Sequence, residues 1–233
     1  MHRSGILAAL FAVSACSGNL GSEPGSGDGD GAGPDGGATA VDNAPNCPSV
    51  LADVTAVTPT IMLLVDRSGT MNRDFGRDSR WDAIYETLMN GSSGLVRELD
   101  EKVSFGLALY TGQDGNPTCP IVNQVAPALG NYDAIDKEFA TKGPLEDTPT
   151  GESLDLVAGY LASLPNTGPK AIVIATDGEP DSCAAPDPDG QPAAKALAVA
   201  AADRAWDAGI KTFVISVGDE VSDGHLQDMA NAG

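Results

Sequence analysis

Apolar residues along most of the chain fall into two kinds of segment that alternate with each other. Short apolar runs bounded by polar or glycine-rich turns predict buried β-strands, and longer segments with apolar residues at helical spacing predict amphipathic helices. The expected strands cover residues 61–65, 103–110, 171–175 and 210–217, with a short antiparallel edge strand at 121–125. The expected helices cover residues 81–99 (interrupted near Asn90), 132–139, 151–164, 193–208 and 223–230. This alternation predicts a doubly wound α/β fold, with a mostly parallel sheet and helices on both faces.

The N-terminal 46 residues do not follow this pattern. Residues 1–15 combine a positive start, a short apolar core and small residues before Cys16, which together are typical of an export signal. The apolar core is too short for a transmembrane helix. Residues 16–46 are dominated by Gly, Asp, Ser and Pro, and such a segment cannot bury enough surface to offset the entropy of ordering it. We therefore expect a signal peptide (1–15), a disordered tether (16–46) and one folded domain (47–233).

The export signal ends in Val13-Ser14-Ala15-Cys16, which resembles the bacterial lipobox. This resemblance implies that Cys16 is lipidated and becomes the first residue of the mature protein. The chain would then be exported to the bacterial cell envelope and anchored to a membrane. Ser17 rather than Asp follows the cysteine, which in enteric bacteria favours the outer membrane. The alternative is an ordinary secretory signal with an incidental cysteine.

Polar side chains that could bind a cation follow two of the expected strands. Asp66, Ser68 and Thr70 come at alternate positions after the first strand, and Asp177 follows a later one. The carboxyl ends of neighbouring parallel strands meet at the crevice where open α/β sheets bind ligands. Carboxylate and hydroxyl oxygens are hard ligands that suit Mg²⁺ or Mn²⁺. The sequence thus predicts a metal site built from two loops.

The two loops carry D-x-S-G-T-M at residues 66–71 and T-D-G at residues 176–178. They resemble the metal-ion-dependent adhesion site of the von Willebrand factor A family, which is usually written D-x-S-x-S. Thr70 stands where the family has a serine and keeps the hydroxyl. The resemblance spans about residues 58–232 and implies a Rossmann-like fold. It also implies that Asp66, Ser68, Thr70 and Asp177 hold the ion together with one more threonine.

The remaining threonine lies at the start of the helix expected at 151–164. Thr148 is the expected ligand, because in the family this residue precedes the small turn that opens the helix, and Thr148-Pro149 fits that turn better than Thr150-Gly151. Thr150 is the alternative ligand. Its other role would be to cap the helix.

The resemblance implies coordination without catalysis. Mg²⁺ is the expected cation, with Mn²⁺ or Ca²⁺ as alternatives, and one coordination position is left for a carboxylate of a protein or peptide partner. The formal net charge of −20 favours cation uptake and disfavours nucleic acid, whose phosphates it would repel. The expected function is therefore that of a membrane-anchored, metal-dependent adhesion module that is not an enzyme.

A phosphohydrolase of the haloacid-dehalogenase type is the competing interpretation, since a strand followed by D-x-x-G-T also resembles that family. Asp66 would then be a nucleophile that attacks phosphate, and Asp177 would hold magnesium. Those enzymes usually have a general acid two residues after the nucleophile, and Ser68 cannot do that work.

Two further expectations concern the cysteines and the end of the chain. With Cys16 lipidated, an odd number of cysteines remains, and Cys47 with Cys119 is the preferred disulfide, while Cys183 could pair with something that this chain does not contain. Domains of the von Willebrand factor A family continue with another strand and a closing helix, so we expect the domain to lack its last strand and helix. The strand at 210–217 would then be an exposed edge. The alternative is that the natural protein ends at Gly233.

Overall fold

A five-stranded sheet forms the centre of the domain, with the order β5-β4-β1-β6-β7. The structure, a computed structural model, describes residues 57–166, 168–188 and 190–233, so the expected signal peptide, Cys16, the tether and Cys47 lie outside the described residues. The strands are β1 (Thr60–Asp66), β4 (Ser104–Thr111), β5 (Ile121–Ala128), β6 (Lys170–Thr176) and β7 (Ile210–Ser216). All neighbouring strands are parallel except β5, which is antiparallel to β4 at one edge.

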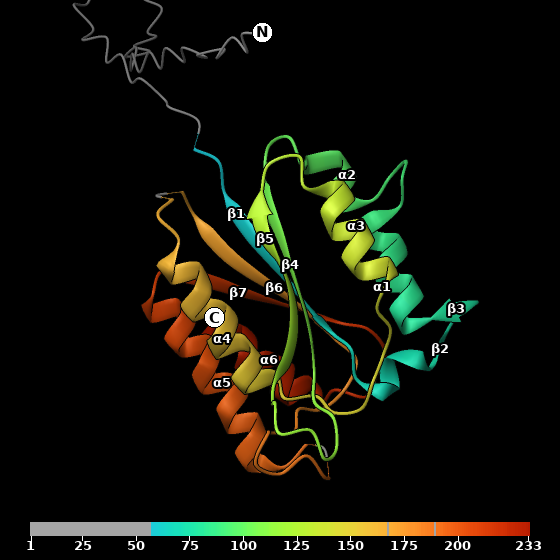
Figure 1. The fold of residues 1–233 in the computed structure, drawn as a ribbon. Coiled ribbons are helices and arrows are strands. Elements are labelled where there is room, and N and C mark those ends of the chain that lie inside the picture. Colours follow the sequence, from blue (N-terminus) through green and yellow to red (C-terminus); the bar gives the residue numbers. More distant parts are fainter. Residues whose placement is uncertain (1–56, 167, 189) are drawn as a thin grey trace, which may run out of the picture. The chain divides into compact units, whose positions relative to one another are not determined.

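Helices cover both faces of this sheet (Figure 1). One face packs against α1 (Arg80–Met89), α2 (Leu95–Leu99) and α3 (Tyr132–Ala140). The other packs against α4 (Thr150–Ser163), α5 (Pro192–Asp207) and α6 (Asp223–Ala232). The predicted doubly wound fold is confirmed, including the break between α1 and α2 after Asn90. None of the helices among the described residues is long and apolar enough to cross a membrane.

β1 is the central strand and is buried from both sides. Met62 and Leu64 point into the core with α4 and α5, whereas Leu63 and Val65 point into the core with α1 and α3. Burial on both faces explains why this strand is an unbroken apolar run rather than an alternating one.

The connection from β1 to α1 was not predicted from the sequence, whereas the exposed edge strand expected at 210–217 is present as β7. A 3-10 turn (Gly69–Asn72) and a short antiparallel hairpin of β2 (Asp74–Phe75) and β3 (Asp78–Ser79) connect β1 to α1. Two-residue strands are too short to show any periodicity, so the sequence gives no sign of them. At the other end of the sheet, β7 is an edge strand on which Phe213 and Ile215 are 53% and 45% exposed.

Candidate metal centre

The candidate site lies where the loops after β1 and β6 meet, at the carboxyl ends of these neighbouring strands. Asp66 is the last residue of β1, and Asp177 directly follows β6. A third segment, between α3 and α4, reaches the same place because the amide of Gly69 donates a 2.9 Å hydrogen bond to the carbonyl of Glu146. A Cβ at Gly69 would lie 3.0 Å from the carbonyl oxygen of Leu145, so a glycine permits this close approach.

Asp66 is fully buried and both of its carboxylate oxygens accept hydrogen bonds. The amide of Ser68 donates to Oδ1 and the hydroxyl of Thr176 donates to Oδ2, each over 2.7 Å. Burial raises the pKa of Asp66 to about 7, the hydrogen bond from Thr176 opposes the rise, and the charge of Asp177 adds to it. Asp66 is therefore held rigidly in a position where it would gain from a nearby cation.

Two hydroxyls and one carboxylate oxygen converge next to Asp66. Oγ of Ser68 lies 2.9 Å from Oγ1 of Thr70 and donates to Oδ1 of Asp177 over 3.4 Å. Oγ1 of Thr70 donates to the same Oδ1 over 2.8 Å. The four residues of the two sequence motifs are thus brought together, with Ser68 and Asp177 buried.

The hydroxyls of Thr148 and Thr150 lie in different surroundings. A Cβ at Gly178 would lie 3.5 Å from Oγ1 of Thr70 and 3.9 Å from Oγ1 of Thr148, so both hydroxyls border the same glycine. The hydroxyl of Thr150 instead lies 3.1 Å from the hydroxyl of Tyr110 and donates to the carbonyl of Thr148 over 3.3 Å, on the core side. Thr150 also does not cap α4, because it is the first residue of the helix and the cap position is Pro149.

Arg80 borders the site but belongs to neither of the two sequence motifs. It is 6% exposed, and its Nη1 lies 2.7 Å from Oδ2 of Asp177 and 2.7 Å from Oε2 of Glu220. Arg80 is the first residue of α1, where the helix dipole disfavours a cation. A basic residue at a helix start is thus a sequence signal for a nearby acidic partner.

Thr176 and Arg67 were also missed. Thr176 was visible only as part of T-D-G, and it is the donor to Asp66 described above. Arg67 is buried, and its Nε and Nη2 donate to the carbonyl of Gly143 while its Nη1 donates to Asn123. Arg67 thereby fixes the segment that carries Thr148. Because Arg67 occupies the x position of D-x-S, the motif gives no sign of this role.

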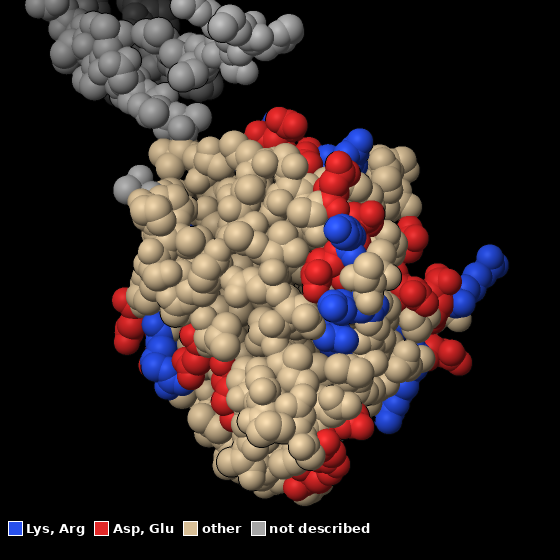
Figure 2. All heavy atoms as spheres, viewed as in Figure 1, with Lys and Arg blue, Asp and Glu red and all other residues tan. Residues whose placement is uncertain are grey.

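The donor set fits a small, hard divalent cation. Two carboxylates and three hydroxyls are available, and such oxygen ligands suit Mg²⁺ and Mn²⁺. Among the described residues no group of three or more His, Cys, Asp and Glu side chains is arranged to hold a metal, so any site here depends on hydroxyls. Acidic side chains are visible at the lower end of the domain in Figure 2, where the loops after β4 and β6 lie (Figure 1).

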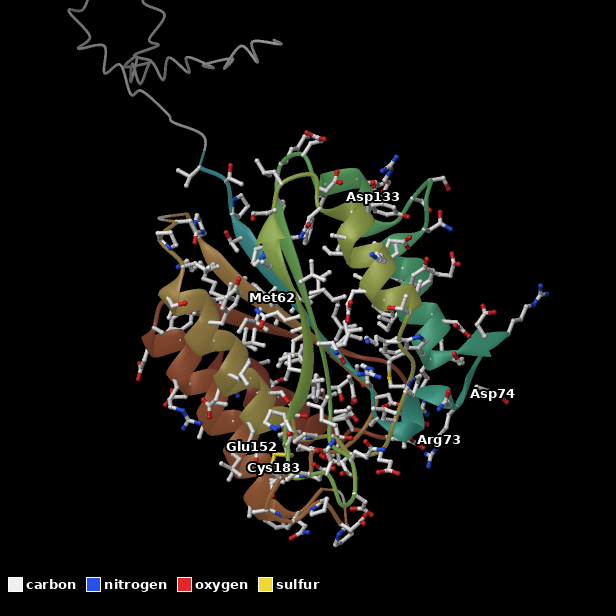
Figure 3. All side chains as sticks on the ribbon, in the orientation of Figure 1. Met62, Arg73, Asp74, Asp133, Glu152 and Cys183 are labelled. Atoms are coloured by element: carbon white, nitrogen blue, oxygen red, sulfur yellow. A yellow bond between two sulfur atoms is a disulfide. The ribbon has the colours of Figure 1, made fainter. Side chains whose placement is uncertain are left out.

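A disulfide joins Cys119 to Cys183, so the predicted pair of Cys47 and Cys119 is wrong. Cys119 lies in the loop after β4 and Cys183 in the loop after β6, both at the carboxyl end of the sheet, with their Cα atoms 5.5 Å apart. The two loops are far apart in the sequence, and the packing of the sheet brings the two cysteines together. Figure 3 shows Cys183 beside Glu152, whose Oε1 accepts a 3.0 Å hydrogen bond from the amide of Cys183.

Comparison with known proteins identifies one family. The model of the von Willebrand factor type A domain matches residues 60–233, whereas no curated protein matches the chain. Among solved structures, an aerotolerance-related membrane protein from Bacteroides fragilis NCTC 9343, with multiple mutations to serines, matches with 20% identity and a TM-score of 0.53. The match covers 75% of this chain and 87% of that one.

Two further structures have the same fold. Manganese-loaded TRAP protein from Plasmodium vivax matches with 17% identity and a TM-score of 0.56, over 77% of this chain and 65% of that one. The pilus adhesin SpaC from Lactobacillus rhamnosus GG matches with 16% identity and a TM-score of 0.57, over 76% of this chain but only 28% of that one.

Proposed function

Because the chain belongs to the von Willebrand factor type A domain family, we propose that it binds a divalent cation and, through it, a protein or peptide partner. The cation is Mg²⁺, with Mn²⁺ and Ca²⁺ as alternatives. The proposed ligands, direct or through water, are the two carboxylates and three hydroxyls at the carboxyl end of the sheet, namely Asp66, Ser68, Thr70, Thr148 and Asp177.

The observation that carries this proposal is the convergence of Ser68 and Thr70 on Oδ1 of Asp177, within 3.4 and 2.8 Å. Without a cation, these hydroxyls satisfy the carboxylate. The hydroxyl oxygens keep lone pairs that can coordinate a cation. When bound, the cation supplies a positive centre that a carboxylate of the partner can approach.

Each protein group then has a role in binding rather than in catalysis. Asp66 supplies charge from a fixed position, because Ser68 and Thr176 hold its two oxygens. Arg67 keeps the segment of Thr148 in place. The Mn²⁺-loaded TRAP protein and the pilus adhesin among the structural neighbours support a metal-dependent adhesion role.

The phosphohydrolase alternative is disfavoured by the environment of Asp66. A nucleophile needs an oxygen that can reach the phosphorus atom. Asp66 is fully buried, and both of its oxygens accept hydrogen bonds from the protein. Ser68, at the position of the general acid in those enzymes, donates to Asp177 instead.

We further propose that the protein is exported and anchored to a membrane, the outer membrane, through lipid on Cys16. This part rests on the sequence of the first 17 residues. The tether at residues 16–46 would then let the domain reach partners beyond the lipid surface.

Calorimetric titration with Mg²⁺ and Mn²⁺ tests the metal site. The full chain carrying Cys16→Ala, which cannot be lipidated, serves as the reference. Asp66→Asn should weaken binding by about 100-fold or more, because it removes a ligand charge from a buried site. Asp133→Asn is the matched control, since Asp133 is an exposed residue of α3, away from the site, and should leave the affinity unchanged (Figure 3).

Equal affinity in Asp66→Asn and the reference would rule out the site. Hydrolysis of p-nitrophenyl phosphate that depends on Mg²⁺ and disappears in Asp66→Asn would support the phosphohydrolase instead. Partner capture on the immobilised domain should be lost with EDTA and recovered with Mg²⁺.

A further inference from the structure

A line of four alternating charges runs from the surface into the candidate metal site. Arg73 pairs with Glu220, Glu220 pairs with Arg80, and Arg80 pairs with Asp177. Exposure of the side chains falls along this line, from 56% at Arg73 and 32% at Glu220 to 7% at Arg80 and 0% at Asp177. Arg73, labelled in Figure 3, is the exposed end of the line.

The buried end of this line stabilises an otherwise unfavourable pair of charges. Asp66 and Asp177 are both fully buried and repel each other. A buried carboxylate without a counter-charge is strongly destabilising. Arg80 supplies that counter-charge at 2.7 Å from Asp177, so the site can be folded without a cation.

The guanidinium of Arg80 is held in place by the backbone of the loop after β7. A Cβ at Gly218 would lie 3.0 Å from both Cζ and Nε of Arg80. Gly218 also has φ of +109°, which favours glycine. The loop therefore packs directly on the guanidinium, which has no room to move toward Gly218 when a cation arrives.

Arg80 also divides the two oxygens of Asp177. Oδ2 binds Arg80, whereas Oδ1 accepts from Thr70 and Ser68. Only Oδ1 of Asp177 therefore faces the hydroxyls of Ser68 and Thr70. Part of the negative charge of Asp177 is neutralised by Arg80 at Oδ2.

We propose that Arg80 is an internal counter-ion that limits the affinity of the site for divalent cations, and that Glu220 sets how strongly it does so. This inference rests on the proposed metal-binding function. Asp66 and the four charged residues of the line, namely Asp177, Arg80, Glu220 and Arg73, carry a formal net charge of −1, which a divalent cation changes to +1. Without Arg80 the charge would change from −2 to 0. Arg80 therefore weakens cation binding but leaves the loaded site positive, which favours an anionic group on the partner.

Glu220 acts in the opposite direction to Arg80. Its carboxylate lies 2.7 Å from Nη1 of Arg80 and offsets part of the guanidinium charge. Because Glu220 is partly exposed and lies in the loop between β7 and α6, its loss should not leave a buried charge unpaired. Its removal should increase the repulsion between Arg80 and the incoming cation.

Three variants test this inference in the Cys16→Ala background. Arg80→Gln should bind Mg²⁺ about tenfold more tightly in calorimetry, because a positive charge beside the ion is removed. Its thermal midpoint in EDTA should fall, and Mg²⁺ should raise that midpoint by more than in the reference protein. Arg80→Lys, which keeps the charge, should stay close to the reference in affinity. Glu220→Gln should bind Mg²⁺ more weakly.

The direction of the affinity change separates this role from a merely structural one. Equal or weaker Mg²⁺ binding by Arg80→Gln overturns the inference, since loss of structure alone would weaken binding. If Arg80→Gln does not fold, the Mg²⁺ affinity of Glu220→Gln tests the inference instead. Unchanged or tighter Mg²⁺ binding by Glu220→Gln overturns it. If the reference protein does not bind Mg²⁺, the proposed metal site is overturned as well. If the reference protein binds Mg²⁺ but the affinities of the variants change in the opposite direction to that expected, only the role of Arg80 is overturned.

Discussion

Thr148 and Asp181 bind each other in both directions. The amide of Thr148 donates to Oδ2 of Asp181 over 2.6 Å, and the amide of Asp181 donates to the carbonyl of Thr148 over 3.1 Å. Asp181 belongs to the loop after β6, which is bridged to the loop after β4 by Cys183. The orientation of Thr148 is therefore fixed by a segment more than thirty residues away.

This arrangement predicts different effects for the two neighbouring threonines. Thr148→Val keeps the shape of the side chain but removes the hydroxyl that borders Gly178, so Mg²⁺ affinity should fall about tenfold with little change in thermal stability. Thr150→Val removes the contact with Tyr110 and should lower the free energy of unfolding by about 1 kcal/mol with unchanged Mg²⁺ affinity. Calorimetry and urea unfolding of both variants measure the two quantities. The opposite pattern would make Thr150 the ligand.

The pKa of Asp66 predicts a pH dependence of stability in the absence of divalent cations. The folded-state pKa is about 7 and the unfolded value is near 3.8, so between these pH values the folded protein holds a proton that the unfolded chain has released. The free energy of unfolding should therefore fall as the pH rises from about 4 to about 7, by at most about 1.4 kcal/mol per pH unit.

Urea unfolding in EDTA at several pH values measures this effect. Asp66→Asn is the matched control, because the amide does not titrate, and the difference between the two proteins isolates the contribution of Asp66. Saturating Mg²⁺ should reduce the slope, since the cation replaces the proton. If the free energy of unfolding changes equally with pH in the two proteins, the pKa of Asp66 is not raised in the folded state.

The sequence predicted the fold better than it predicted the site. Strand β1 was recognisable because burial on both faces demands an unbroken apolar run, and the ligand candidates follow the strands directly. Arg80, Asp181 and the partner of Cys119 were missed, because each acts through a contact between loops that are distant in the sequence. Only the packing of the sheet brings those loops together.

The disulfide between Cys119 and Cys183 should stabilise both the domain and the site. It closes a loop with a sequence separation of 64, for which the chain-entropy model gives about 4 kcal/mol. The double variant Cys119→Ser, Cys183→Ser should therefore have a lower thermal midpoint that no longer responds to reducing agent. Its Mg²⁺ affinity should fall by about threefold to tenfold, because Asp181 lies two residues from Cys183 and holds Thr148.

Cys47→Ser is the control for the rejected pairing. Its thermal midpoint and its response to reducing agent should equal those of the reference protein. A loss of stability in Cys47→Ser as large as that of the double variant would contradict the pairing in the structure.

The edge strand β7 should promote self-association. Phe213 and Ile215 are exposed on it, and Ile215 lines an apolar cavity of about 200 Å³ with Phe75 and Ile84. An exposed apolar edge can pair with another chain. Phe213→Lys should therefore reduce light scattering on heating or at high concentration. Leu129→Lys is the matched control, since Leu129 is 51% exposed but lies outside the strands, and an equal reduction there would exclude a role for the edge.

Cys16→Ala tests the proposed anchor. In bacteria that express the full chain, the wild-type protein should partition into the detergent phase and the variant into the aqueous phase, because a lipid chain is the only anchor that we propose. Ser17→Ala serves as the control and should behave as the wild type. Detergent partitioning of Cys16→Ala would contradict lipidation.

The direction of β1 also decides which end of the sheet carries the candidate metal site. The chain enters the domain at Val57, begins β1 at Thr60 and reaches Asp66 at its end. A strand of seven residues is roughly 23 Å long, so the entry point and the site lie at opposite poles of the sheet. A force applied between the entry point at Val57 and the site at Asp66 would act along the length of β1. The hydrogen bonds from β1 to its parallel neighbours β4 and β6 would then be loaded in shear, so they would have to break together rather than one at a time.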